Sequence, residues 1–296
     1  MTIAFGIYAP AGFATDPAAL DRAVARLRGW GHRVVVDTGA TARWTRFAAT
    51  DDERLAAIAR MAAHEDVDVA MAVRGGYGWT RMLDRLDFGA LAQSGKRWLG
   101  HSDFTAFQIA ALAHAGMVTY AGPMAAYDFG GEAPSAWTLE HCFSVLESRD
   151  SEAVFPLDGP DISVAGTLWG GNLTMVASLV GTRHFPGIDG GILFLEDVAE
   201  HPYRVERLLY QLHYADVLVR QRAVLLGGFT EYQLNDNDGG YDLAAAVAQL
   251  RSIAGVPIFT GLPFGHVPDK LTLPVGGQCA LDVRDGSARI RLSDYA

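Results

Sequence analysis

Through the first 130 residues, short apolar runs alternate with longer segments in which apolar residues recur every three or four positions. The short runs are typical of buried strands, and the longer periodicity is typical of helices that cover a sheet. Strand and helix in regular alternation predict an α/β fold with a parallel sheet and helices on both faces. The expected strands are 3–9, 33–37, 67–73, 96–101 and 117–121, and the expected helices are 16–30, 50–64 and 103–115. The spacing of Thr50 and Glu53 predicts a capping box for the helix at 50–64.

The pattern changes after residue 130, where glycine and proline become frequent around one helical piece at 137–146. We predict a linker at 131–165, which divides the chain into domains at 1–130 and 166–296. The second domain is expected to end in turn-rich β-structure. Its expected strands are 191–197, 223–229 and 257–262, and its expected helices are 172–180, 202–215 and 242–254.

The composition narrows the possible partners. The 296 residues suffice for one large α/β domain or for two domains. A formal net charge of −10 argues against nucleic acid as the main partner, because phosphate binding requires a basic face. Cys142 and Cys279 lie far apart and fit buried thiols in a reducing compartment. The sequence has no H-E-x-x-H motif and no Cys/His cluster, so we predict no metal site and no cofactor.

Two segments bear on membrane association. The N-terminus has no Lys or Arg before its first apolar run, which favours a strand over a signal peptide. Residues 104–127 carry no formal charge, but Gly122 and Pro123 interrupt them, which favours a buried helix followed by a strand over a membrane span. We therefore expect a soluble, cytoplasmic protein without a membrane partner.

The segment G-H-S-D at 100–103 joins an expected strand directly to an expected helix. A serine at such a turn is exposed, and the N–H of the next residue points the same way, which suits a nucleophile and one oxyanion donor. Only half of the G-x-S-x-G signature is present, because Phe104 stands where the second glycine would be. The alternative is that Ser102 caps the helix that follows it.

A second loop, R-G-G-Y-G at 74–78, also follows an expected strand. Ligands bind at the carboxyl ends of strands in open parallel sheets, so this loop and Ser102 are expected at the same edge. Glycines in such a loop let backbone N–H groups approach an anion. An ordinary tight turn accounts for the loop equally well.

A serine nucleophile requires a base and an acid that orients the base. His266 is the favoured base, because it lies in a Pro/Gly-rich loop directly after an apolar strand. Glu196 closes another apolar strand, where a carboxylate is costly without a partner. For the pair Glu196–Asp197 the alternative role is capping of the helix at 202–215, which fits Asp197 better. Trp169, beside two glycines, suggests a substrate wall or else a turn before a helix.

Five separate segments together resemble the LD-carboxypeptidases of murein tetrapeptide, a family of serine peptidases. They occur in the family's order and at its spacing along nearly the whole chain: RGGYG, GHSDFTA, GTLWGGNL, LEDVAEHPYRVERLLYQL and GLPFGH. The resemblance implies an N-terminal domain like that of class I amidotransferases, a smaller β-rich α+β C-terminal domain, and a homodimer. It implies release of terminal D-Ala from tetrapeptide or a related muropeptide during peptidoglycan recycling.

Carried over by motif, the family's nucleophile falls on Ser102, its acid on Glu196 and its base on His266. The resemblance implies oxyanion donors from the backbone N–H groups of Asp103 and of a glycine in 74–78, with Gly76 favoured and Gly75 possible.

An exopeptidase must also bind a free carboxylate, and Arg74 and Arg204 are the cations suited to it. Each of the two could instead form a structural ion pair. A sister group in the family hydrolyses peptide–nucleotide antibiotics such as microcin C, so an immunity hydrolase is the alternative function. A binding module without catalysis is a third.

Overall fold

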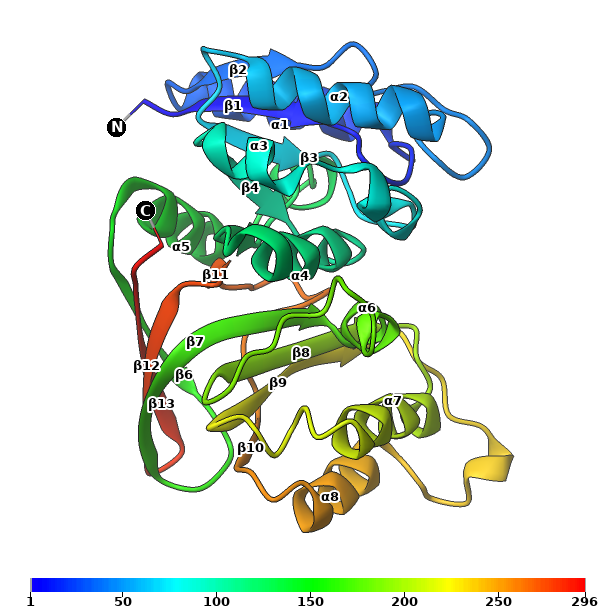
Figure 1. Cartoon of the computed structure of the whole chain (residues 1–296), viewed down its shortest axis with the longest axis vertical. Helices are drawn as coiled ribbons and strands as arrows, with labels where there is room; N and C mark the ends of the chain where they lie inside the picture. Colours follow the sequence, from blue (N-terminus) through cyan, green and yellow to red (C-terminus); the bar gives the residue numbers. More distant parts are fainter. Residues whose placement is uncertain (1, 296) are drawn as a thin grey trace.

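The computed structural model describes residues 2–295 and contains two β-sheets, one above the other in Figure 1. The strands of the first sheet are β1 (Ala4–Tyr8), β2 (Arg33–Val36), β3 (Val69–Ala72), β4 (Arg97–Gly100), β5 (Thr119–Ala121) and β11 (Leu273–Val275). Their order is β11-β5-β4-β3-β1-β2. Strands β1 to β5 pair in parallel, and β11 pairs antiparallel with β5.

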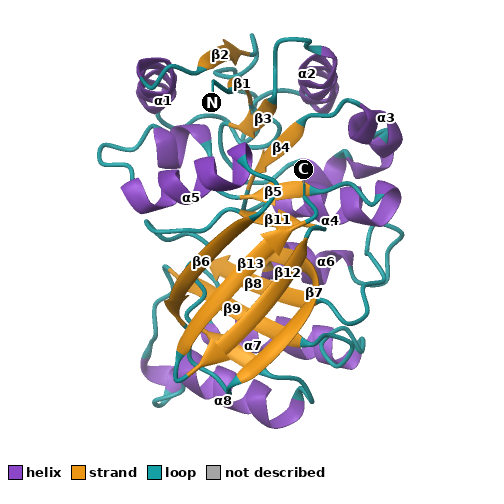
Figure 2. Cartoon of the chain, turned by 90° about the vertical axis from the view of Figure 1, so that its left-hand side faces the viewer, coloured by secondary structure: helices purple, strands orange, loops and turns teal. Residues whose placement is uncertain are grey.

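Helices cover both faces of this sheet, as Figure 2 shows. One face carries α1 (Pro17–Gly29) and α5 (Ala136–Glu147), and the other carries α2 (Asp51–Ala63), α3 (Phe88–Gln93) and α4 (Phe104–Ala115). The predicted capping box at the start of α2 is present, because the side chains of Thr50 and Glu53 each accept the other's backbone N–H. The predicted parallel sheet with helices on both faces is therefore confirmed.

Helix α4 lies between the two sheets (Figure 1). Its residues from Phe104 to Ala111 are all buried, so it has no polar face. A helix that is apolar all round belongs to a core. This explains the uncharged stretch after Ser102, and no helix within residues 2–295 is long and apolar enough to cross a membrane.

The second sheet is part parallel and part antiparallel. Its strands are β6 (Ser151–Pro156), β7 (Ile162–Asn172), β8 (Ile192–Val198), β9 (Ala223–Thr230), β10 (Ile258–Thr260), β12 (Gln278–Arg284) and β13 (Ser287–Ser293). The order is β10-β9-β8-β7-β12-β13-β6, with β7 to β10 parallel and the rest antiparallel. The helices of this half are α6 (Leu173–Leu179), α7 (Pro202–Tyr214) and α8 (Leu243–Ile253).

Strand β7 is the longest strand and was not predicted from the sequence. Its glycines at 170 and 171 resemble a turn, but here they let neighbouring segments approach closely. A Cβ on Gly170 would lie 1.9 Å from the carbonyl oxygen of Phe194, and one on Gly171 would lie 2.4 Å from Oγ1 of Thr105. These glycines therefore bring β7 against β8 on one side and against α4 on the other.

The division into domains at 1–130 and 166–296 stays a prediction, but the segment 131–165, predicted as a linker, contains a helix and a strand. Helix α5 packs on the first sheet, and β6 forms an edge of the second, so the segment is not an extended connection. Strand β11, from the second half of the chain, is an edge strand of the first sheet. Apolar side chains of both halves form one continuous core. Local glycine and proline content does not reveal these pairings, because they are formed by distant partners.

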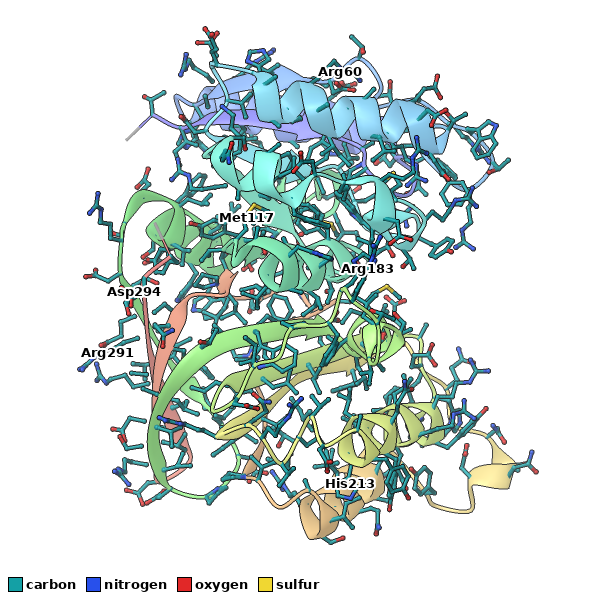
Figure 3. The ribbon with its side chains drawn as sticks, viewed as in Figure 1. Arg60, Met117, Arg183, His213, Arg291 and Asp294 are labelled. Atoms are coloured by element: carbon teal, nitrogen blue, oxygen red, sulfur yellow. The ribbon has the colours of Figure 1, made fainter. Side chains whose placement is uncertain are left out.

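The two layers also meet through polar side chains at the end of α6. Arg183, labelled at this junction in Figure 3, forms an ion pair of 2.6 Å with Asp84. His184 lies 2.8 Å from the same carboxylate and 2.9 Å from His114 of α4. Asp84 belongs to a short helix, and the short helices are η1 (Trp79–Arg81), η2 (Leu83–Arg85), η3 (Ala125–Phe129) and η4 (Asp236–Asp238).

Candidate active site

Ser102 lies at the turn where β4 ends and α4 begins. Its φ angle of 65° is in the left-handed region that residues with a side chain rarely adopt. Such a backbone costs about 1–3 kcal/mol and persists only where its surroundings enforce it. The N-cap position of α4 is Asp103, and no side chain caps the helix. Ser102 is therefore not the helix cap, and its turn resembles the strained elbow that presents a nucleophile.

The glycine loop at 74–78 packs against this turn. A Cβ on Gly75 would lie 2.7 Å from Cβ and 2.9 Å from Oγ of Ser102. The carbonyl oxygen of Gly75 accepts a hydrogen bond of 3.0 Å from the N–H of Gly12. In a trans peptide the C=O and N–H point in opposite directions, so the N–H of Gly76 points away from Gly12.

Glu196 lies two residues before the end of β8, and His266 lies in the loop between β10 and β11. Nδ1 of His266 is 2.8 Å from Oε2 of Glu196, which is fully buried. This contact supplies the partner that a carboxylate in an apolar strand requires. The side-chain amide of Asn172 donates to the other carboxylate oxygen at 3.3 Å. Because Nδ1 is held by the carboxylate, Nε2 is the ring nitrogen left to face a reacting group.

The two histidines beside Ser102 have different electrostatics. Burial lowers the pKa of His266, but the hydrogen bond and charge of Glu196 raise it more, so that pKa is above its ordinary value. Burial and the charge of Lys270 hold the pKa of His101 well below its ordinary value. The ring of His101 lies 5.2 Å from that of His266, between centroids. His101 is thus a neutral neighbour, and His266 is the histidine able to accept a proton and stabilise the charge.

One cleft of about 510 Å³ brings these groups together. Ser102 and Gly76 line it from the first sheet, and His266 lines it from the loop that leaves the second. Arg74 also lines it, with Nη1 donating to the carbonyl oxygen of Phe13 at 3.3 Å. Within residues 2–295 no carboxylate lies within ion-pair distance of Arg74, so its charge is available to a bound anion. Burial, with a smaller effect of Arg46, lowers the pKa of Arg74, and a guanidinium stays charged under these conditions.

The expectation that Trp169 forms a substrate wall is wrong. Its side chain is 1% exposed, and its indole N–H donates to Gln221 at 2.9 Å. Trp169 lies on β7, where it pairs with Leu193 of β8, and its ring packs in the core.

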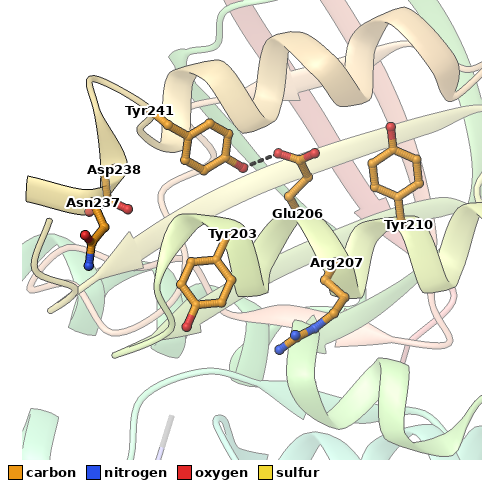
Figure 4. Close-up of a pocket in the computed structure, with 7 residues that line it drawn as sticks. All are labelled: Tyr203, Glu206, Arg207, Tyr210, Asn237, Asp238 and Tyr241. Atoms are coloured by element: carbon orange, nitrogen blue, oxygen red, sulfur yellow. Dashed lines mark hydrogen bonds between the residues drawn. The ribbon is translucent and has the colours of Figure 1, made fainter. Parts of the chain in front are cut away.

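Arg204, the second candidate for binding the carboxylate, does not line the Ser102 cleft and forms the ion pair that was its alternative role. It lies on α7, its side chain is 53% exposed, and it pairs with Glu200 at 3.7 Å. A separate hollow of about 570 Å³ adjoins this part of α7, and Figure 4 shows tyrosines beside charged and amide side chains around it. Its lining residues are Tyr203, Glu206, Arg207, Tyr210, Asn237, Asp238 and Tyr241. None of them belongs to the Ser102 cleft.

Sequence reasoning missed Asn172, which connects the parts of the site. Its backbone N–H donates to Oγ1 of Thr105 at 3.0 Å, and its side-chain amide donates to Asp197 at 2.8 Å. Asp197 in turn accepts the N–H of Thr174, so it supports the start of α6 and not the helix at 202–215. The available signal was an asparagine directly before a helical segment, which is typical of an N-cap.

No three His, Cys, Asp or Glu side chains within residues 2–295 gather in a way that could hold a metal ion. The groups that the cleft and its surroundings offer for chemistry are the serine hydroxyl, the imidazole, the carboxylate and the backbone N–H groups described above.

Comparison with known families gives two matches along the chain. Residues 5–122 match the model of the LD-carboxypeptidase N-terminal domain, and residues 165–281 match that of the C-terminal domain. A murein tetrapeptide carboxypeptidase of Pseudomonas aeruginosa is 32% identical over 254 residues, with 81% of each chain covered.

Solved structures agree with these matches. The crystal structure of a muramoyltetrapeptide carboxypeptidase from Oxalobacter formigenes has a TM-score of 0.93 and 46% identity, and 99% of each chain is covered. The microcin C7 self immunity protein MccF has a TM-score of 0.90 at 23% identity, with 99% of this chain and 96% of that chain covered. At that identity the second similarity shows a shared fold alone.

Proposed function

Because the chain belongs to the LD-carboxypeptidase family and is a serine-type carboxypeptidase, we propose that it releases the terminal D-Ala of murein tetrapeptide through Ser102, His266 and Glu196. The observation that carries the proposal is that His266, held by Glu196 at 2.8 Å, lines the same cleft as Ser102. The names of the relatives, which act on murein tetrapeptide or muramoyltetrapeptide, support this substrate class.

In the proposed reaction, His266 takes the hydroxyl proton of Ser102, and Oγ attacks the carbonyl of the L-centre in the third residue of the peptide. D-Ala leaves with a proton from His266, and water then hydrolyses the acyl-enzyme with the same base. Glu196 fixes the tautomer of the imidazole and stabilises its cation. The backbone N–H groups of Asp103 and Gly76 are the proposed oxyanion donors, because both lie in turns against Ser102.

The direct test is to incubate the enzyme with murein tetrapeptide and follow the loss of one alanine by mass spectrometry. The same peptide ending in L-Ala is the matched control, since an LD-specific enzyme should leave it intact. A chain that releases no alanine from the D-Ala peptide would overturn the proposed function.

We propose that Arg74 binds the terminal carboxylate, because its guanidinium lies in the cleft without an acidic partner among the residues described. Arg74→Met should raise KM about 10- to 100-fold, the range expected for loss of a charged hydrogen bond. The variant should also lose the preference of the wild type for a free carboxylate over a C-terminal amide. Arg204→Met is the control and should keep the wild-type KM. A wild type that is indifferent to amidation would contradict a carboxylate site.

Glu196→Gln should lower kcat by about 10²-fold, the lower end of what positioned acid–base catalysis contributes, because the amide no longer stabilises the imidazolium. The carboxylate raises the pKa of His266, so removing its charge lowers that pKa. The acid limb of the kcat/KM profile should therefore shift to lower pH while the plateau falls. Measuring the profile with tetrapeptide checks both effects, and full activity would point to a different acid.

We further propose that the enzyme is a cytoplasmic homodimer, as the resemblance implies. Light scattering on the purified protein should give twice the 31.8 kDa mass of one chain. A mass of one chain at micromolar concentration would contradict the dimer.

A further inference from the structure

The side chain of Asp103 takes no part in the reaction described above, yet it is buried and directly follows the nucleophile in the sequence. It is 2% exposed, and Oδ2 accepts the backbone N–H of Trp79 at 3.1 Å. The N–H of Gly78 also acts on this carboxylate. Oδ1 is buried and has no hydrogen-bond partner within residues 2–295. An acidic side chain this deeply buried requires a reason, because its desolvation is costly.

The groups that Asp103 holds belong to the loop of the second oxyanion donor. Gly78 and Trp79 lie two and three residues after Gly76, and Gly75 is the residue in contact with Ser102. The backbone N–H of Asp103 is itself the other proposed donor. One residue therefore contributes its N–H to one half of the oxyanion hole and its carboxylate to the loop that forms the other half.

The charges that face this carboxylate are the guanidinium groups of Arg54 on α2 and of Arg46. Arg54 is itself buried, and its Nη1 donates to the carbonyl oxygen of Pro10 at 2.7 Å. Burial raises the pKa of Asp103 to about 6, against the opposing effects of the Trp79 N–H and of Arg54. The carboxylate is therefore ionised at neutral pH and gains a proton in mild acid.

We propose that Asp103 is a positioning residue, whose ionised carboxylate holds the 75–79 loop so that its two neighbouring oxyanion donors converge on the Ser102 substrate carbonyl. The inference rests on the proposed function. A proton on Asp103 can be held by the unpartnered Oδ1. It removes the negative charge, so Oδ2 accepts the Trp79 N–H more weakly and the loop is held less firmly. The neutral amide of asparagine does the same at every pH.

The test compares Asp103→Asn with the wild type across pH. The variant should lower kcat for D-Ala release about 10²-fold at pH 8, the effect of losing one oxyanion donor, with KM changed by less than about threefold. One unit below a pKa of about 6, roughly a tenth of the wild type keeps the ionised carboxylate. The ratio of wild-type to variant rate should therefore fall about tenfold between pH 8 and pH 5. The titration of His266 cancels in this ratio, because both enzymes share it.

Asp52→Asn is the matched control, because that carboxylate is on the surface and pairs only with Arg85 among the described residues. Its rate ratio to the wild type should stay near one at every pH. A purely structural role for Asp103 would give a rate ratio that does not change with pH, and that result would overturn the proposal. So would an Asp103→Asn enzyme with wild-type kcat at pH 8.

A second readout separates this inference from the choice of substrate. A fluorophosphonate reacts with the serine through the same oxyanion hole and needs no peptide. If the wild type reacts with the probe but releases no D-Ala, the proposed function fails, and the pH dependence of the phosphonylation ratio still tests Asp103. A ratio that falls about tenfold supports the positioning role, and a constant ratio refutes it.

Discussion

Ser102→Ala is expected to lower the rate of D-Ala release by about 10³-fold or more, the effect of removing the nucleophile of a catalytic triad. The hydroxyl is the only part of the side chain that is lost, and the strained turn remains. Substrate affinity should therefore stay close to that of the wild type. Release of D-Ala by mass spectrometry and peptide binding by calorimetry measure the two quantities on the same protein.

The variant also tests whether the nucleophile has been assigned correctly. Fluorophosphonate labelling should disappear with the hydroxyl, while the thermal unfolding temperature should change little. An active Ser102→Ala enzyme would end the proposed mechanism, whatever its substrate.

Gly75→Ala should have an effect of similar size, although the residue takes no part in bond making. The added methyl group would lie 2.7 Å from Cβ and 2.9 Å from Oγ of Ser102, so one of the two segments must move. Displacing a nucleophile by about 1 Å costs about 10²-fold, and shifting an oxyanion donor with it brings the expected loss in kcat to about 10³-fold.

Gly29→Ala provides the control for this prediction. A Cβ at Gly29 would meet no atom within 4 Å, and the residue ends α1 and is not among those that line the cleft. The variant should keep wild-type kcat, and because Gly29 is the last residue of α1 its gain in stability from helix propensity should be at most about 0.5 kcal/mol. If Gly75→Ala kept wild-type kcat as well, the close contact between the glycine loop and Ser102 would be irrelevant to the reaction.

Much of the fold could be predicted from the sequence where neighbouring residues carry the signal. The strands and helices of the first half follow from hydrophobic periodicity, and the capping box of α2 from the spacing of Thr50 and Glu53. Strand β7 was missed because its glycine pair reads as a turn, and its real role depends on Phe194 and Thr105, which are distant in sequence. Strand β11 was missed as a member of the first sheet for the same reason.

The residues of the candidate site could likewise be predicted only where the signal lies in neighbouring residues. Ser102, Glu196 and His266 each stand out locally, since each follows or closes an apolar strand. Trp169 stands out by the same local logic and is buried, because an aromatic residue beside glycines serves a packed core equally well. The roles of Asn172 and of the Asp103 carboxylate depend on partners 24 residues away in the chain. Local patterns cannot reveal such partners.

The loop that carries His266 leaves β10, a strand of the second sheet, and enters β11, an edge strand of the first. Its two ends are thus tethered to different layers of the molecule. Any sliding or hinging of one layer over the other would pull on this loop and change the separation of the imidazole from Ser102. Cutting the chain between the layers would accordingly produce fragments in which the base is anchored at one end only. The separation of His266 from Ser102 therefore depends on the position of one sheet relative to the other.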